Sequence, residues 1–329
     1  MTRVLEVQNL RISFPAGNQQ RFYPVDGVSF SLDRGETLAL VGESGCGKSL
    51  TSLALLQLVP APGRIEEGSV IRLGDTDVLA LSGEALRQVR GRRIGMVFQD
   101  PMTSLNPVFT VGDQIMEGIL AHFKMPRSQA RDRALQLLQE VGIPDPTSRL
   151  QAYPHQLSGG MRQRVMIAIA LSAEPEILVA DEPTTALDVT VQAQILEVLD
   201  RLRASRGMAV LLITHDLGIV AGRADRVAVM YAGQIVEETQ TSRLFANPSH
   251  PYTQGLFASV PRLTGPLTRL TPIGGSVPAP TAWPSGCRFR PRCPKSFEKS
   301  ELEPPLLPVE PGHRMRCWLA EQPNGIHHK

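Results

Sequence analysis

The stretch GESGCGKS, at residues 42–49, has residue types and a spacing that suit the binding of phosphate. It follows the apolar run TLALV and precedes a helical pattern, as in a strand that leads through a glycine-rich loop into a helix. The glycines let backbone N–H groups turn towards a phosphate, and the helix N-terminus favours its negative charge. In this pattern Lys48 reaches the β- and γ-phosphates of a nucleotide, and the Ser49 hydroxyl ligates Mg²⁺. The loop residues predicted to bind are Gly42, Ser44, Gly45, Cys46, Gly47, Lys48 and Ser49.

Cys46 lies inside this loop, close to the start of the expected helix. A thiol at a helix N-terminus has a lowered pKa, which makes it reactive. The sequence therefore predicts that a bulky thiol reagent modifies Cys46 and inhibits the protein, and that bound ATP protects it. The alternative is that Cys46 is a small side chain that only fills space.

Polar side chains follow three other apolar runs, where α/β folds build their sites. Asp181 ends the run ILVAD and could hold the Mg²⁺ of a nucleotide through water, while Glu182 could polarise an attacking water. Gln99 follows IGMVF, and His215 follows AVLLIT. A glutamine or a histidine at such a position is also a common loop or capping residue, so each gains weight only beside the others.

A second glycine-bearing stretch, LSGGMRQR at 157–164, precedes a helical pattern and offers no nucleophile, base or metal ligand. Glycines in this position indicate that the backbone comes close to another molecule or segment.

The elements that must position these residues alternate between strands and helices, which predicts an α/β fold with a largely parallel sheet covered by helices. Helical spacing of apolar residues occurs over 130–142 and 191–205. An antiparallel β portion is expected near the N-terminus. The expected strands are 28–32, 37–42, 93–98, 176–181, 209–214 and 226–231.

The composition is that of a globular protein, with 42% hydrophobic and 20% charged residues among 329. A formal net charge of +2 argues neither for nor against nucleic acid. The longest apolar runs fall short of the roughly 18 residues that a membrane span needs. The N-terminus lacks the apolar core of a secretory signal, so we expect a cytosolic or peripheral protein.

The motifs GESGCGKS, FQDP, LSGGMRQR, ILVADEP, TALD and THD occur in this order, and with them residues 1–260 resemble the nucleotide-binding subunit of an ABC transporter. The resemblance implies that ATP and Mg²⁺ are the cofactors. It implies that Lys48 contacts phosphate, and it assigns Ser49, Gln99 and Asp181 to Mg²⁺.

The same resemblance implies roles in hydrolysis. Glu182 matches the catalytic base, His215 the switch histidine at the γ-phosphate, and Gln99 the hinge that senses nucleotide. Phe14 falls where the family places an aromatic ring on adenine, although Phe22 and Tyr23 are close enough to take its place.

The resemblance also explains the LSGG stretch. It implies that Ser158, Gly159 and Gly160 close over ATP held by a second subunit, head to tail, with Asp188 in the adjoining D-loop. Because each nucleotide then needs both subunits, an isolated monomer is expected to hydrolyse ATP slowly or not at all.

Three stretches, QDPMTSLNPV, HPYTQGLFASVP and the cysteine-bearing tail, are similar to ATPase subunits of dipeptide and oligopeptide importers. That subgroup includes nickel, glutathione and some oligosaccharide systems. The similarity implies two permease subunits, a second ATPase subunit that is a paralogue or the same chain, and indirectly an extracytoplasmic binding protein. It implies a peripheral location at the cytoplasmic face of the inner membrane, with no nucleic acid partner.

More than half of the 27 prolines lie after residue 245, with three of the four cysteines. Cys287, Cys293 and Cys317 match three of four cysteines that hold a [4Fe–4S] cluster in some relatives, but Ser300 takes the fourth place. A serine oxygen is a rare iron ligand, which favours a labile or absent cluster. The alternatives are a zinc site that adds His313, or no metal.

The expected domains are an ATPase at 1–245 and an irregular extension at 246–329. A helical insertion over about 100–172 is the expected docking surface for a permease. A soluble ABC ATPase for DNA repair or ribosomes is the alternative function, and a catalytically silent subunit is a third. The single phosphate loop argues against the first alternative, and Glu182 with His215 argues against the second.

Overall fold

The computed structural model describes residues 2–17, 20–185, 187–259 and 272–321. They form two compact units, each built from several stretches of the chain. The first unit contains Met1–Glu6, Ser31–Thr37 and Arg72–Ile213, and the second contains Val7–Phe30, Leu38–Ile71 and Thr214–Lys329, as far as these are described. The predicted α/β fold is confirmed.

Three parallel strands form the sheet of the first unit, in the order β9 (Ala209–Thr214), β8 (Ile177–Asp181), β7 (Ile94–Val97). Ile177 of the central strand pairs with Ile94 on one side and Ala209 on the other. Every residue of β8 and β9 is buried, which explains why these strands read as unbroken apolar runs in the sequence.

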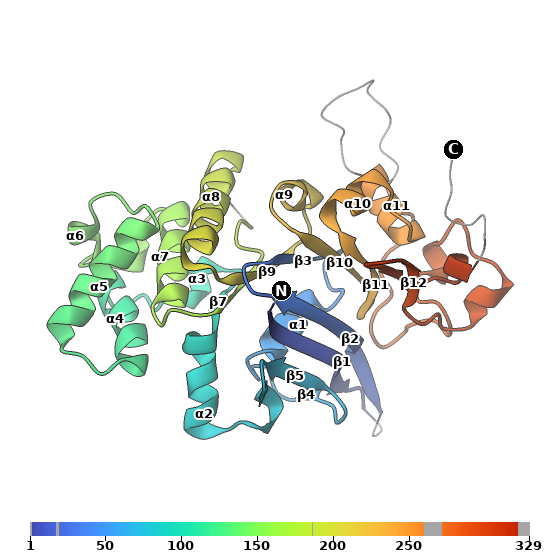
Figure 1. The fold of residues 1–329 in the computed structure, drawn as a ribbon, viewed down its shortest axis with the longest axis horizontal. Coiled ribbons are helices and arrows are strands. Elements are labelled where there is room, and N and C mark those ends of the chain that lie inside the picture. Colours follow the sequence, from blue (N-terminus) through green and yellow to red (C-terminus); the bar gives the residue numbers. More distant parts are fainter. Residues whose placement is uncertain (1, 18–19, 186, 260–271, 322–329) are drawn as a thin grey trace. The chain divides into compact units, whose positions relative to one another are not determined.

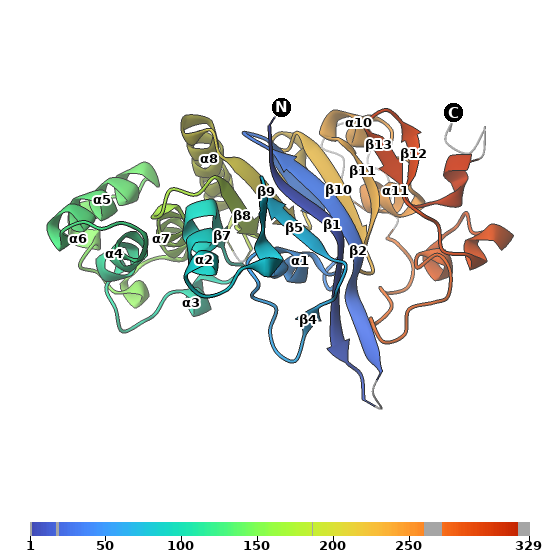
Figure 2. The ribbon, with the colours of Figure 1, turned by 60° about the horizontal axis from the view of Figure 1, so that its bottom comes forward.

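Helices make up most of the rest of the first unit, and Figures 1 and 2 show α4, α5, α6 and α7 gathered together. α4 begins after Thr110, whose hydroxyl accepts the Asp113 N–H at 3.1 Å, and α7 begins after Ser158. The helices of this unit are α2 (Gly83–Gln88), α3 (Pro101–Ser104), α4 (Val111–His122), α5 (Arg127–Glu140), α6 (Pro146–Arg149), α7 (Gly159–Leu171) and α8 (Val189–Arg206).

In the second unit, β3 (Thr37–Val41) pairs in parallel with β10 (Arg226–Tyr231). β10 pairs antiparallel with β11 (Gln234–Gln240), as Figure 1 shows. The helices of this unit are α1 (Lys48–Ala54), α9 (Leu217–Ala221), α10 (Thr241–Ala246) and α11 (Pro251–Ala258).

The segment after residue 245 is less irregular than its prolines predict. β12 (Leu307–Glu310) and β13 (His313–Met315) pair with each other, and β13 pairs with β11. Pro308 is accommodated because β12 is the edge strand of this sheet, where a missing N–H is tolerated. Residues 260–271 and 322–329 of the predicted extension lie outside the described part.

The expected antiparallel β portion is confirmed. β1 (Arg3–Pro15) pairs antiparallel with β4 (Arg64–Ile65), and β5 (Val70–Leu73) does so with β6 (Thr76–Asp77). β2 covers Arg21–Asp33. No helix among the described residues combines the length and the apolar character that a bilayer span requires.

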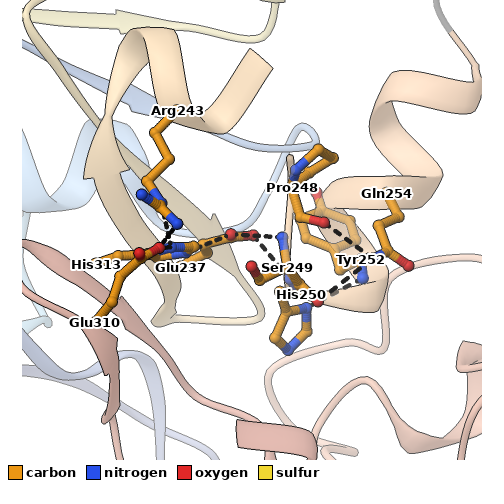
Figure 3. Close-up of polar contacts among 9 residues, drawn as sticks. All are labelled: Glu237, Arg243, Pro248, Ser249, His250, Tyr252, Gln254, Glu310 and His313. Atoms are coloured by element: carbon orange, nitrogen blue, oxygen red, sulfur yellow. Dashed lines mark hydrogen bonds and ion pairs between the residues drawn. The ribbon is translucent and has the colours of Figure 1, made fainter. Parts of the chain in front are cut away.

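A buried carboxylate organises the second unit after β11, as Figure 3 shows. Glu237 is fully buried and accepts the backbone N–H groups of Ser249 at 2.8 Å and His250 at 2.9 Å. Its carboxylate also lies 2.8 Å from the His313 Nε2. Burial alone raises the pKa of Glu237, but these hydrogen bonds outweigh it and hold the pKa below its usual value.

His313 is held on both sides. Its Nδ1 lies 3.3 Å from the Glu310 carboxylate and 3.3 Å from the Arg243 Nε, and Arg243 and Glu310 form an ion pair. This network joins α10, β11, β12 and β13 through groups that range from the exposed Arg243 to the fully buried Glu237 and His313. Removing one of the buried partners would leave the other without its hydrogen bond.

His250 caps α11 in the same region. Its Nδ1 accepts the Tyr252 N–H at 3.1 Å, which requires an unprotonated nitrogen. Burial lowers the pKa of His250 to about 4, and the nearby Glu237 offsets only part of that effect.

We expect the second unit to lose stability as the pH falls from 6.5 towards 4. The pKa of His250 is about 4 in the folded chain against an ordinary 6.5, so its contribution is complete above 6.5 and is lost through this window. The full effect is about 3 kcal/mol. Urea unfolding followed by tryptophan fluorescence reports on this unit, because Trp283 and Trp318 both lie in it.

The matched control is His250→Asn, which keeps a capping side chain but does not titrate. Its unfolding free energy should be flatter between pH 6.5 and 4.5, because the Glu237 contribution is lost only as the pH falls below the ordinary carboxyl pKa of 4.5. An equally steep dependence in this variant would contradict the assignment.

Candidate functional site

The loop between β3 and α1 is packed tightly where the sequence has glycine. A Cβ on Gly42 would lie 2.1 Å from the Met230 carbonyl oxygen, and one on Gly47 would lie 2.6 Å from the Pro24 carbonyl oxygen. Gly47 also has a φ of 104°, which other residues rarely adopt. Both glycines are therefore required by contact with the rest of the second unit, whereas Ser44 and Gly45 between them are exposed.

Lys48 is buried at the start of α1. Its Nζ donates to the carbonyl oxygens of Gly42 at 2.7 Å and Glu43 at 3.0 Å. The ammonium group is thus held inside the loop that would bind phosphate. Ser49 follows it as the second residue of α1.

The prediction that Cys46 has a lowered thiol pKa is wrong. Its side chain is fully buried, and burial raises the pKa of the thiol, although Lys48 beside it acts in the opposite direction. The Cys46 carbonyl accepts the Gly233 N–H at 3.0 Å, which fixes the residue from the β10–β11 turn. The effect of the helix N-terminus, which lowers a thiol pKa, is therefore outweighed by the exclusion of the thiol from water, which raises it.

In the first unit, the predicted polar residues at the ends of β7 and β8 come together. The Gln99 Nε2 donates to a Glu182 carboxylate oxygen at 3.1 Å, and the Thr185 hydroxyl donates to the same oxygen at 2.8 Å. The Glu182 N–H is bound by the Ile213 carbonyl at 2.9 Å. Glu182 has a φ of 45°, a conformation that costs about 1–3 kcal/mol in non-glycine residues and recurs at functional sites.

Asp181, the last residue of β8, is 3% exposed. The adjoining carboxylates therefore differ in their surroundings, since Asp181 is buried and Glu182 is half-buried.

The LSGG stretch forms the start of α7. The Ser158 hydroxyl accepts the Met161 N–H at 3.3 Å, and both Ser158 and Gly159 are exposed. A Cβ on Gly160 would lie 2.6 Å from the Val191 Cγ1, so this glycine lets α7 approach α8. The structure thus explains Gly160 within the chain and leaves Ser158 and Gly159 facing outward.

The remaining predicted residues have simple local environments. Asp188 caps α8, where its carboxylate accepts the Val191 N–H at 2.9 Å. Phe14 stacks on Phe22 with ring centroids 5.8 Å apart. His215 is exposed just after β9.

The predicted nucleotide residues occur in both units. The second holds Phe14, residues 42–49 and His215, and the first holds the other predicted nucleotide residues: Gln99, Ser158, Gly159, Gly160, Asp181, Glu182 and Asp188.

The cysteine-bearing segment does not fit a metal centre. Ser300, in the fourth place of the cluster pattern, uses its hydroxyl to accept the Phe297 N–H at 3.2 Å and its carbonyl to accept the Cys287 N–H at 3.0 Å. Burial raises the pKa of Cys287 and Cys293, and that of Cys317 to about 12.

The alternative zinc set is wrong, because both ring nitrogens of His313 already face Glu237 and Glu310. Among the described residues, no group of three or more His, Cys, Asp and Glu side chains is placed to hold a metal ion. The prediction of an iron–sulfur cluster is not supported.

Several contacts around the loop were not predicted. Arg292 binds the Glu43 carboxylate, and the Tyr252 hydroxyl accepts the Glu43 N–H. The HPYT stretch marked Tyr252 as distinctive but did not indicate a contact with the loop. Nothing in the sequence singled out Arg292 or Glu43.

A glycine loop after a buried parallel strand, with a lysine inside it and adjoining carboxylates at the end of another buried parallel strand, defines a P-loop nucleotide-binding protein. The family model described as ABC transporter matches residues 25–185. The model described as oligopeptide/dipeptide transporter, C-terminal region, matches residues 236–299.

The chain is similar over nearly its whole length to curated transport ATP-binding proteins. It is 50% identical over 324 residues to the oligopeptide transport ATP-binding protein AppD of Bacillus subtilis (strain 168), covering 98% of each chain. It is 47% identical over 328 residues to the dipeptide transport ATP-binding protein DppD of Haemophilus influenzae, covering 99% of each. The chain therefore belongs to the ABC transporter family, as one of its ATP-binding subunits.

Solved structures agree with this assignment. A dimeric structure of the ATP-binding cassette MJ0796 with ADP and Pi is 27% identical, with a TM-score of 0.63, covering 72% of this chain and 98% of that one. The structure of cbiO1 from Clostridium perfringens, part of the complex cbiONQ, is 27% identical, with a TM-score of 0.63, covering 75% and 92%.

We expect Cys46 to resist alkylation in the folded chain, because its thiol is buried and its raised pKa disfavours the thiolate. N-ethylmaleimide should leave the Cys46 peptide unmodified at neutral pH and modify it fully in urea, as measured by peptide mass spectrometry. The other three cysteines, read in the same spectra, serve as internal references. Rapid modification of Cys46 in the folded chain, with protection by ATP, would restore the prediction from the sequence.

Proposed function

We propose that this chain hydrolyses ATP to energise the import of dipeptides, oligopeptides or similar small solutes through a membrane complex. The observation that carries the proposal is the pairing of a complete phosphate loop with the Gln99–Glu182 contact, in a chain that also matches the C-terminal region of peptide transporters. The relatives described above are named as oligopeptide and dipeptide transport ATP-binding proteins, and this chain matches them over nearly their full length.

The loop residues bind the nucleotide, and the residues at the strand ends bind Mg²⁺ and take part in hydrolysis. Lys48 and the backbone of residues 42–49 bind the phosphates, with Phe14 or a neighbouring ring at the adenine. Oxygen donors from Ser49, Asp181 and Gln99 suit Mg²⁺, which neutralises phosphate charge when bound. Glu182 would accept a proton from the attacking water as the water oxygen bonds to the γ-phosphorus. The bond from that phosphorus to the β–γ bridging oxygen would break and ADP would leave, with His215 in contact with the γ-phosphate.

The second half of each site comes from another chain. Ser158 and Gly159 are exposed at the N-terminus of α7 and can approach the phosphates of a nucleotide bound to another chain. Neither residue has a side chain that could act as a base in hydrolysis. Two ATPase subunits, identical or paralogous, therefore close over two nucleotides head to tail, with Asp188 near the contact. Closure and reopening transmit force to the transporter.

The helical region after Gln99 contacts the permease. Among the side chains that the structure describes in this region, four large apolar ones are exposed, and Val108 is the most exposed of them at 71%. Such side chains suit a protein partner. They are Val108, Phe109, Leu120 and Tyr153.

The assembly comprises this chain, a second ATPase subunit and two permease subunits, with an extracytoplasmic binding protein that delivers the solute. The chain is then peripheral, at the cytoplasmic face of the inner membrane. Peptides are favoured over nickel or glutathione because the full-length relatives carry peptide names. An iron–sulfur cluster is not part of the proposal, since Ser300 takes the fourth ligand place and no metal-holding group is found among the described residues.

Glu182→Gln is expected to trap an ATP-bound dimer, because binding and closure remain while the acceptor for the water proton is lost. With MgATP, sedimentation should show dimers that persist for hours, and ATP hydrolysis should fall by about 100-fold or more. The matched control is Glu197→Gln, on the exposed face of α8, which should behave like the wild type. Undiminished hydrolysis by Glu182→Gln would remove Glu182 from the proposed role.

The test of transport is what co-purifies with the chain, tagged at its N-terminus, from gently solubilised native membranes. Two polytopic membrane proteins and an ATPase subunit are expected. Recovery only from the soluble fraction, with ribosomes or DNA-repair proteins, would contradict import and favour a soluble ABC ATPase.

A further inference from the structure

Glu43, the second residue of the phosphate loop, is bound by an arginine from the segment after residue 245. The Arg292 Nη1 donates to one carboxylate oxygen at 2.8 Å, and the Nη2 donates to the other at 3.0 Å. Paired hydrogen bonds of this kind fix both the distance and the orientation of the carboxylate. The Arg292 side chain is 4% exposed and that of Glu43 is 31% exposed, so solvent screens the pair less than an ordinary surface ion pair.

Arg292 is itself held by its own segment and by the end of β10. The Nε donates to the Gly274 carbonyl at 2.9 Å, and the guanidinium lies 5.7 Å from the centre of the Tyr231 ring. The hydrogen bonds to Glu43, with that carboxylate's charge, raise the pKa of Arg292. The guanidinium is therefore a fixed, charged group that meets the loop.

Tyr252 of α11 makes a second contact with the same loop residue. Its hydroxyl oxygen accepts the Glu43 N–H at 3.0 Å. Its ring is fully buried, 4.6 Å from the ring of Tyr231 and 5.4 Å from that of Phe289. Packing against the rings of Tyr231 and Phe289 holds this hydroxyl in place, so the backbone of Glu43 is bound as well as its side chain.

These contacts bear on the groups that would bind nucleotide. The Glu43 carbonyl accepts from the Lys48 Nζ at 3.0 Å and from the Cys46 N–H at 3.4 Å. A shift of Glu43 therefore moves the acceptor that orients Lys48 and changes the turn at Cys46. Preorganised loops bind more tightly because less conformational entropy is lost on binding.

We propose that Arg292 and Tyr252 are positioning residues for nucleotide binding, through which the C-terminal segment holds the phosphate loop in its binding conformation by way of Glu43. The inference rests on the proposed function, because it takes residues 42–49 as the ATP site. The inference also assigns a role to the HPYT stretch, in which His250 caps α11 and Tyr252 contacts the loop.

The experiment is equilibrium binding of fluorescent trinitrophenyl-ATP, with Mg²⁺, to the full-length chain. Arg292→Met keeps the aliphatic volume and removes the paired hydrogen bonds, and it should raise the Kd about tenfold. Glu43→Gln, in the loop itself, should have a similar effect. Because both remove one interaction, the double variant should bind no more weakly than either single variant. Tyr252→Phe should also weaken binding.

Two controls separate positioning from a general loss of structure. Arg290→Met removes a neighbouring, more exposed arginine whose carboxylate partner, on Glu301, is 3.5 Å away, and it should bind like the wild type. Urea unfolding followed by tryptophan fluorescence shows whether each variant is folded. Arg292→Lys, which keeps the positive charge but cannot form the paired hydrogen bonds of a guanidinium, should restore binding only in part.

Wild-type affinity in folded Arg292→Met and Glu43→Gln would overturn the inference, as would a fully additive double variant. Lys48→Ala separates this outcome from failure of the proposed function. If the wild type binds the probe and Lys48→Ala does not, the ATP site is established whatever Arg292 does. If the wild type does not bind the probe, the proposed function fails, and the inference fails with it.

Discussion

The parallel pairing of β3 with β10 is the constraint on which the phosphate loop depends. It places the Met230 carbonyl so close to Gly42 that no side chain fits there. It also brings the β10–β11 turn against Cys46, whose carbonyl binds the Gly233 N–H. The loop is thus held at both ends by backbone contacts, and its exposed middle, at Ser44 and Gly45, stays open to a ligand.

The same pairing connects the loop to the C-terminal segment. Tyr231 ends β10 and packs against Tyr252 and Phe289, both from the region that follows β11. Buried charges rather than long helices then order this region, as Glu237 shows by binding two backbone N–H groups and His313. A proline-rich segment can be well ordered in this way, because its polar groups find partners that a regular element would otherwise supply.

Much of this architecture could be predicted from local patterns. Strands buried on both faces read as apolar runs, so β3, β7, β8, β9 and β10 were expected close to where they lie. The carboxyl ends of parallel strands share an edge, which is why the structure brings Gln99 and Glu182 together. Glycine-rich loops at strand ends are similarly local, and GESGCGKS was found from its spacing alone.

The features that were missed depend on contacts distant in sequence. Glu43 and Arg292 are 249 residues apart, and no periodicity links them. The Cys46 pKa was misjudged because the thiol is fully buried, which the residues around the helix start do not reveal. Gly160 belongs to the LSGG stretch, yet its close contact is with Val191 of the same chain. Ser300 replaces a cysteine, and only the structure shows its capping role.

The central claim is that each ATP site is completed by a second ATPase subunit. The most direct measurement is the rate of ATP hydrolysis per chain as a function of protein concentration. The chain is mixed with the ATPase subunit that co-purifies with it from membranes. If no such subunit co-purifies, the chain is measured alone. The account predicts a rate per chain that rises with concentration and then saturates, as sites form by association. A rate per chain that stays constant on dilution would show a site complete within one chain, and would contradict the role assigned to Ser158 and Gly159.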